Sequence, residues 1–440
     1  MGVERVRALS SLPGMTAAVL FFAAATWLLF AVGAAVAVVS GSLAAGQWRS
    51  YPVLAANHLL TLGWGTLGAL GALHQMFPAV LGISSKPGCA AAAHFAFTVA
   101  GVLVLLAGLL AAAPPWVALG GMWLVSSVVA FCAFLARLAP RRRRWPPSAT
   151  GIVLSVGYLL VTVLWGTLMA LNWNFRFWPA LYTYAGVGVH ATLGLLGWFV
   201  QLVVSVSYYL LPRFTGVRTV SEGRVLPLVG LLNLSVGLFV AAAALRAPSV
   251  ARAATLVLCT ASLAYALDVL RFLRGARQQA PDLTNWHWWA MAVQTLLAVA
   301  TASLWAVGVL PLEGRRLAAA AATWLLCGWV TLAIMGQMYK VTPFLMWGYR
   351  YAHGLSAYEV PRLPAPYFPR WGLVAFALAA PASTLLPAAV LLAQVRLAQA
   401  AGSLFAAGCA VYALGMGVSW VAAVLVRPEK PQTGAARQPG

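Results

Sequence analysis

Twelve long apolar runs follow one another along this chain of 440 residues, with short polar connections between them. A run of about 20 apolar residues is long enough to cross the hydrocarbon core of a bilayer as an α-helix. The runs are continuously apolar, so they lack the alternating pattern of outer-membrane barrel strands. The sequence therefore predicts an all-α membrane protein with about twelve transmembrane helices, centred on residues 15–40, 52–80, 90–112, 114–137, 149–171, 180–211, 224–245, 250–270, 287–310, 317–342, 371–393 and 399–426.

The composition agrees with this class and excludes a soluble globular domain. Hydrophobic residues make up 62% of the chain and charged residues 8%, whereas a globular chain carries about 25% charged residues. The first run is long and lacks a small-residue cleavage site, so we interpret it as a span rather than a cleaved signal peptide. We expect a single membrane domain over residues 1–440, in which residues 427–440 form a cytoplasmic tail.

Three Gly-Trp pairs indicate a threefold internal repeat. They lie in the second, sixth and tenth runs, and their tryptophans are 134 and then 131 positions apart (198 − 64 and 329 − 198). A ring-bearing residue follows ten positions after each tryptophan, and a proline follows fourteen positions after it. Twelve spans in three repeats predict three four-helix arcs related by an axis along the membrane normal. The units cover approximately residues 15–137, 149–270 and 287–426, and the markers are Gly63-Trp64, His74 and Pro78; Gly197-Trp198, Tyr208 and Pro212; and Gly328-Trp329, Tyr339 and Pro343.

The net charge of +21 is distributed in a way that indicates membrane topology rather than nucleic-acid binding. With a cytoplasmic N-terminus, 21 Lys and Arg residues fall in cytoplasmic segments and 7 in outer loops. This excess follows the positive-inside rule. We therefore predict a multi-pass protein of the cell inner (plasma) membrane, with both termini cytoplasmic, the lipid bilayer as partner and no nucleic acid. Arg141–Arg144 is interpreted as a topology anchor, with contact to anionic lipid as the alternative.

Acidic residues are rare within the runs. Asp268 stands three positions before Arg271 near the inner end of the eighth run, which predicts an ion pair at helical spacing. No paired carboxylates fall in the middle of a span. This argues against a transporter that couples its cycle to protons or sodium.

The histidines are more informative, because a polar group inside a membrane is costly and each one is a functional hypothesis. His58 and His190 lie in the outer halves of the second and sixth runs, and His74 lies in the inner half of the second. His58 and His74 are separated by about 24 Å along a helix, so they cannot bind one metal ion. Tyrosines occupy the position of His74 in the other two repeats, so we interpret His74 as a packed ring with a polar tip.

Small residues line the helix faces below His58 and His190. Such a surface lets a flat macrocycle approach the helix, with the imidazole as axial ligand. Small residues also line ordinary helix–helix contacts in membranes, so the spacing leaves ligation and packing open. The residues are Leu62, Gly65, Ala69 and Ala72 below His58, and Gly194, Gly197 and Gln201 below His190.

His190 is the best candidate for a second ligand beside His58, but its register is different. It precedes its tryptophan by eight residues, whereas His58 precedes Trp64 by six. On an ideal helix, two residues correspond to a rotation of about 200°. Both imidazoles could therefore face one ring only if the sixth span is rotated relative to the repeat.

The phrases around these residues resemble subunit I of the haem–copper oxidase superfamily. His58-Leu-Leu-Thr-Leu-Gly-Trp64 through Pro78, and His190-Ala-Thr-Leu-Gly-Leu-Leu-Gly-Trp198 through Pro212, are similar to the cbb3-type and nitric-oxide-reductase-like branches. They also resemble the NnrS-type membrane proteins, which contain haem and copper. The resemblance implies that His58 is an axial ligand of a b-type haem. It also implies that His190 occupies the general place of a copper ligand.

The sequence departs from the family in two spans. The family has a histidine pair in the seventh span, where this chain offers only Asn233 and Ser235. It has two haem-ligating histidines in the tenth span, where this chain has none and Thr323 corresponds to His58. A copper site normally uses several imidazoles. The resemblance therefore implies a haem with an incomplete copper site.

Three functions follow from these observations. The first is an oxidoreductase-like haem protein in electron transfer or in handling of nitric oxide or oxygen, with cytochromes or other respiratory subunits as partners. The second is a polytopic transporter or permease built on the same repeat. The third is a non-catalytic membrane subunit of a respiratory complex.

Overall fold

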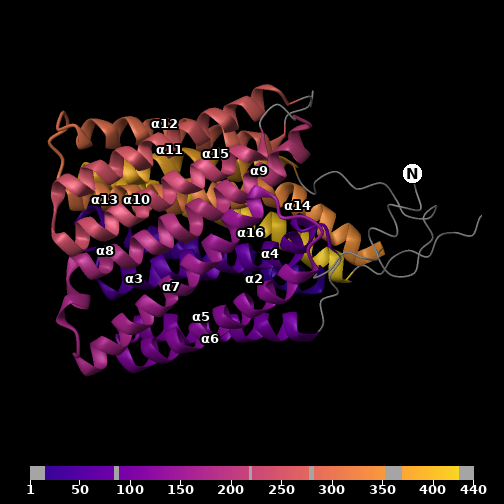
Figure 1. Cartoon of the computed structure of the whole chain (residues 1–440), viewed down its shortest axis with the longest axis horizontal. Helices are drawn as coiled ribbons and strands as arrows, with labels where there is room; N and C mark the ends of the chain where they lie inside the picture. The colour runs from indigo at the N-terminus through magenta and orange to yellow at the C-terminus, as the bar shows by residue number, and fades with distance from the viewer. Residues whose placement is uncertain (1–14, 84–88, 218–220, 277–281, 352–368, 426–440) are drawn as a thin grey trace, which may run out of the picture.

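The computed structural model describes residues 15–83, 89–217, 221–276, 282–351 and 369–425 (Figure 1). Within them, twelve helices are long and apolar enough to cross a membrane, which confirms the predicted number. These residues contain no strand, so the predicted all-α membrane class is confirmed as well. The predicted tail, residues 427–440, lies outside the described residues.

Nine spans are single α-helices, and the other three are interrupted by a π-helical segment. The single helices are α2 (Met15–Ala44), α5 (Cys89–Leu110), α6 (Pro114–Leu138), α7 (Pro147–Phe175), α10 (Val225–Leu245), α11 (Pro248–Arg274), α12 (Leu283–Ala306), α15 (Pro369–Leu391) and α16 (Val395–Leu425). The interrupted spans are α3 (Tyr51–His58), η1 (Leu59–Thr66) and α4 (Leu67–Val80); α8 (Tyr184–Thr192), η4 (Leu193–Val200) and α9 (Gln201–Thr215); and α13 (Gly314–Thr323), η6 (Trp324–Val330) and α14 (Thr331–Tyr351). Short 3₁₀ segments, η2 (Ala139–Arg141), η3 (Pro179–Tyr182) and η5 (Glu222–Arg224), lie beside the connections.

The helices lie side by side along the long axis of the molecule (Figure 1). Many consecutive helices are neighbours, such as α5 and α6, and the last helix α16 packs against the first helix α2. We call the end of the bundle that carries Arg141–Arg144 the arginine-rich end, and the end that carries residues 176–183 the opposite end. His58 and His190 lie in the half toward the opposite end, and His74 and Asp268 lie toward the arginine-rich end.

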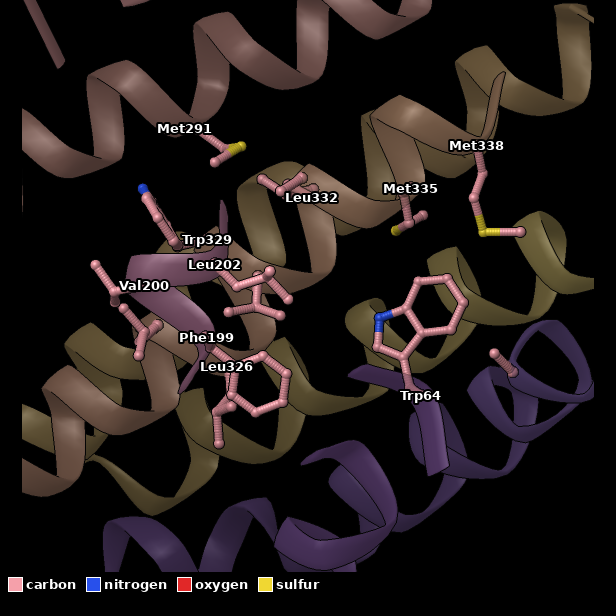
Figure 2. Packing of buried hydrophobic residues seen from close by; sticks show 14 of the residues in the cluster. Trp64, Phe199, Val200, Leu202, Met291, Leu326, Trp329, Leu332, Met335 and Met338 are labelled. Atoms are coloured by element: carbon pink, nitrogen blue, oxygen red, sulfur yellow. The ribbon is translucent and has the colours of Figure 1, made fainter. Parts of the chain in front are cut away.

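Each Gly-Trp pair lies inside one of the three π-helical segments. The segments meet in the core: η6 contacts both η1 and η4, and the indole of Trp198 donates a hydrogen bond to the Thr66 hydroxyl at 3.2 Å. Figure 2 shows Trp64, Trp329 and Phe199 among the buried side chains of this region. π-Helical segments are rare in proteins, and those that occur are often found at functional sites. The shared position agrees with the threefold repeat, whose four-helix units stay a prediction.

The fully buried carboxylate of Asp268 ties three spans together near the arginine-rich end. Arg271 Nη1 donates to Asp268 Oδ1 at 2.6 Å, which confirms the ion pair predicted from the helical spacing. Arg224 Nε and Tyr208 Oη both donate to Asp268 Oδ2, at 2.5 and 2.6 Å. A buried charge is tolerated when it is paired and hydrogen-bonded, so this carboxylate joins the sixth, seventh and eighth spans.

Arg316 joins two other spans at the opposite end. Its Nη1 donates to the carbonyl of Ala44 at 3.0 Å and to the carbonyl of Val390 at 3.1 Å. These carbonyls lie at the C-terminal ends of α2 and α15, where helix carbonyls lack partners within the helix. A cation is favoured there because the helix dipole is negative at its C-terminus.

Replacing Arg316 by methionine should therefore loosen the opposite end of the bundle. A hydrogen bond to a charged group contributes about 1.5–3 kcal/mol, and Arg316 is half-buried, so we expect a loss of about 1–3 kcal/mol of stability in total. Thermal unfolding of the purified protein in detergent measures the change. Arg396→Met, at an exposed arginine of the same end, is the control and should leave the midpoint unchanged. Equal midpoints for the two variants would contradict the assignment.

Candidate metal site at His58 and His190

The structure brings His58 and His190 together. His58 is the last residue of α3 and directly precedes the π-helical segment η1, whereas His190 lies in α8, three residues before η4. The ring centroids are 6.2 Å apart, and the ring planes differ by 23°. On ideal helices, the two-residue difference in register allows this approach only if the sixth span is rotated relative to the repeat. The five residues before each tryptophan are π-helical in both spans, so the difference in register comes from the two α-helical residues 191–192 of α8.

The hydrogen bond of His58 defines which ring nitrogen is free. His58 Nδ1 lies 2.8 Å from the carbonyl oxygen of Leu54, one turn earlier. A carbonyl oxygen only accepts, so Nδ1 carries the proton and Nε2 keeps its lone pair. A histidine that binds a metal commonly donates its other ring N–H to a carbonyl in this way. Leu54 therefore fixes His58 in the tautomer that a metal ligand needs.

His190 also has a nitrogen available. Its Nδ1 is buried and has no hydrogen-bond partner within the described part of the chain. The ring lies against Gly166 of α7, where a Cβ atom would come within 2.8 Å of His190 Cε1. Only glycine allows this approach without displacement of the ring, so α7 and α3 together set the position of His190.

The separation of the two rings fits one metal ion between them. Metal–imidazole bonds are about 2 Å long and a ring nitrogen lies about 1.1 Å from its ring centre, so collinear ligation would separate the ring centres by about 6 Å. The observed 6.2 Å agrees with this value. Both side chains are half-buried, so an ion here would be largely shielded from water. The separation of the ring centres therefore fits two-imidazole ligation of a single metal ion.

The glycine faces below the histidines do not offer a surface to a macrocycle. A Cβ atom at Gly65 would lie 2.7 Å from Cε1 of Phe199, and one at Gly197 would lie 2.4 Å from Cγ of Tyr158. Side chains of neighbouring spans thus cover both glycines. Of the two interpretations that the spacing left open, helix–helix packing holds at these positions, and the candidate site depends on its nitrogen donors.

His74 has a different environment, and it agrees with the interpretation of a packed ring with a polar tip. The ring is 5% exposed, and its centroid lies 5.6 Å from that of Phe21 and 5.2 Å from that of Phe131. Its Nε2 is 3.0 Å from Nδ1 of His94, whose Nε2 is 3.1 Å from the Ser127 hydroxyl. Sequence reasoning missed this network because His94 and Ser127 lie on other spans.

Asn233 of the seventh span takes part in a polar network. The Tyr158 hydroxyl donates to Asn233 Oδ1 at 2.7 Å, and Asn233 Nδ2 donates to Gln201 Oε1 at 2.7 Å. Asn233 is thus held between the fifth and sixth spans. In the residues that the structure describes, no three His, Cys, Asp or Glu side chains group as metal ligands.

Comparison with protein-family models and with curated proteins finds no match for this chain. The fold and the site define a helical, membrane-type protein with twelve candidate spans and a half-buried pair of imidazoles.

Proposed function

We propose that this chain is a haem-binding membrane protein in which His58 and His190 are the two axial ligands of one b-type haem. The observation that supports the proposal is the pair of imidazole rings, whose centroids are 6.2 Å apart. In this pair, the Nδ1 of His58 is hydrogen-bonded to the Leu54 carbonyl. A metal ion held only by two imidazoles also fits this geometry. The resemblance to subunit I of the haem–copper oxidases favours haem.

Ligation by both imidazoles favours electron transfer over binding of a gas. A bound haem supplies a one-electron iron couple, and the protein supplies its ligands and surroundings. If both imidazoles held the iron, nitric oxide or oxygen would have to displace one of them in order to bind. Leu54 orients His58, and Gly166 allows His190 to approach. Placement in the inner membrane, cytoplasmic termini and respiratory subunits as electron partners belong to this proposal.

The visible spectrum of the purified full-length protein tests the proposal. After expression with sufficient haem supply, we expect about one haem per chain, a Soret band and split α and β bands on reduction. Electron paramagnetic resonance of the oxidised protein should show a low-spin ferric signal. A colourless protein would contradict the proposal and would favour the transporter or the non-catalytic subunit.

The isolated chain should not consume oxygen when an artificial electron donor is supplied. Copper in an oxygen-reducing centre is held by several imidazoles, and this chain presents Asn233 within its network with Tyr158 and Gln201. An oxygen electrode measures the rate, with a haem–copper oxidase assayed in the same detergent as positive control. Sustained oxygen consumption above that of the donor alone would contradict the expectation.

A further inference from the structure

Buried polar atoms without hydrogen-bond partners are concentrated near the arginine-rich ends of α12 and α14. Seven of the fourteen such atoms in the described residues belong to two short segments, 285–288 and 337–342. Native proteins satisfy most buried polar groups, and an exception often indicates an ordered water molecule. The seven are Asn285 Oδ1, His287 Nε2, Trp288 Nε1, Gln337 Nε2 and Oε1, Tyr339 Oη and Thr342 Oγ1.

The two segments pack directly on each other. The Thr284 hydroxyl donates to the carbonyl of Gly336 at 2.7 Å, and a Cβ atom at Gly336 would lie 2.7 Å from Cβ of His287. His287 and Tyr339 face each other with ring centroids 5.5 Å apart. The two rings that carry His287 Nε2 and Tyr339 Oη are therefore neighbours between the ninth and tenth spans.

Among the described residues, His287 lacks a hydrogen-bond donor, and Tyr339 lacks an acceptor. His287 Nδ1 lies 2.7 Å from the carbonyl oxygen of Leu283, so Nδ1 carries the proton and Nε2 can only accept. The Tyr339 hydroxyl has a proton to donate, and Thr342, three residues further on the same helix, has another. Each buried group left unsatisfied costs about 1–3 kcal/mol. A water molecule, which donates and accepts, satisfies both kinds of group at once.

An ion pair lies at the same end of these two helices. Lys340, the residue after Tyr339 in α14, pairs with Asp282 at 2.5 Å, and the two side chains are 19% and 15% exposed. The other rings packed against His287 and Tyr339, those of Phe376 and Tyr412, come from α15 and α16. The Tyr339 hydroxyl lies close to α15, where a Cβ atom at Gly372 would come within 3.0 Å of it.

We propose that water molecules bind between α12 and α14, bridge Tyr339 Oη to His287 Nε2, and exchange with the aqueous phase at the arginine-rich end. The site is separate from the His58–His190 pair and does not depend on haem. His287 becomes a titratable group inside the membrane-spanning part that solvent reaches from one end.

Radiolytic hydroxyl labelling of the wild-type protein in ¹⁸O-labelled water tests for the bound water, because radicals form where water lies. Tyr412 is the matched control: it is 2% exposed against 6% for Tyr339, and its hydroxyl donates to the carbonyl of Met335 at 3.2 Å. We expect Tyr339 to be labelled at least several-fold faster than Tyr412. Equal rates would overturn the proposal.

Deuterium exchange at the imidazole Cε1–H, followed by mass spectrometry, tests whether this water reaches His287. His74 is the control, because it is also buried and its Nε2 is bonded to His94. We expect measurable exchange at His287 under conditions in which His74 keeps its hydrogen. Exchange at His287 as slow as at His74 would overturn the proposal even if Tyr339 is labelled.

Discussion

We expect His58→Ala to abolish binding of the proposed haem. His58 has its Nδ1 proton committed to Leu54 and its Nε2 free, and it faces His190 at a distance that fits one ion. Loss of a residue that merely supports a metal ligand costs about 10–100-fold in metal affinity, so loss of the ligand itself should cost at least about 100-fold. Haem content per chain and the reduced spectrum measure the effect.

Three further variants separate ligation from general damage. His190→Ala should lose the haem or change its spin state. Gly166→Val keeps both histidines but places a Cβ atom within 2.8 Å of His190 Cε1, so the ring must shift and haem content should fall as well. His74→Ala should retain the haem, because His74 contacts His94 and phenylalanines away from the pair. A full complement of haem with an unaltered spectrum in His58→Ala would end the ligand assignment.

The number and class of the spans could be predicted because hydrophobic length is a local property of the sequence. The predicted ends of the spans agree less well with the structure. The tenth span continues through Pro343 to Tyr351 instead of ending near residue 342, because a proline within a membrane helix removes only one backbone donor. The sixth helix begins at Tyr184 rather than near residue 180 because Pro179–Tyr182 forms a separate 3₁₀ turn.

The π-helical conformation could not be predicted from the sequence, although its three positions coincide with a repeated sequence feature. The repeated Gly-Trp pairs stand within all three. The sequence has no signal for the change from four-residue to five-residue hydrogen-bond spacing, because both conformations present apolar side chains to apolar surroundings. The five residues before each tryptophan are π-helical in both spans, so the two-residue difference in register between His58 and His190 remains.

Hydrogen-bond partners on the same helix could be predicted from the sequence, whereas partners on other spans could not. Arg271 could be assigned to Asp268 because both lie on one helix at a known spacing. Arg224 and Tyr208 belong to other spans, 44 and 60 residues away, and only the packing of three helices shows that they share the same carboxylate. His74 and His94 follow the same rule, because the partner of His74 lies on the next span.

Replacing Asp268 by alanine should strongly destabilise the sixth, seventh and eighth spans. The carboxylate is fully buried and accepts from Tyr208, Arg224 and Arg271, so alanine leaves a buried hydroxyl and two guanidinium groups without their acceptor. Removing one member of a buried ion pair costs about 3–5 kcal/mol. The arginine side chains are 47% and 58% exposed and can turn to water, so we expect about 2–3 kcal/mol.

Asparagine at position 268 separates the hydrogen bonds from the charge. Its Oδ1 can still accept from Tyr208, whereas both ion pairs are lost, so Asp268→Asn should unfold between the wild-type protein and Asp268→Ala. Tyr208→Phe, which leaves the ion pairs intact, should be milder than either because it removes one neutral donor from a carboxylate that keeps two charged ones. Thermal unfolding of the four proteins in the same detergent gives the order. If Asp268→Ala unfolds at the wild-type midpoint, the buried carboxylate does not hold the three spans together.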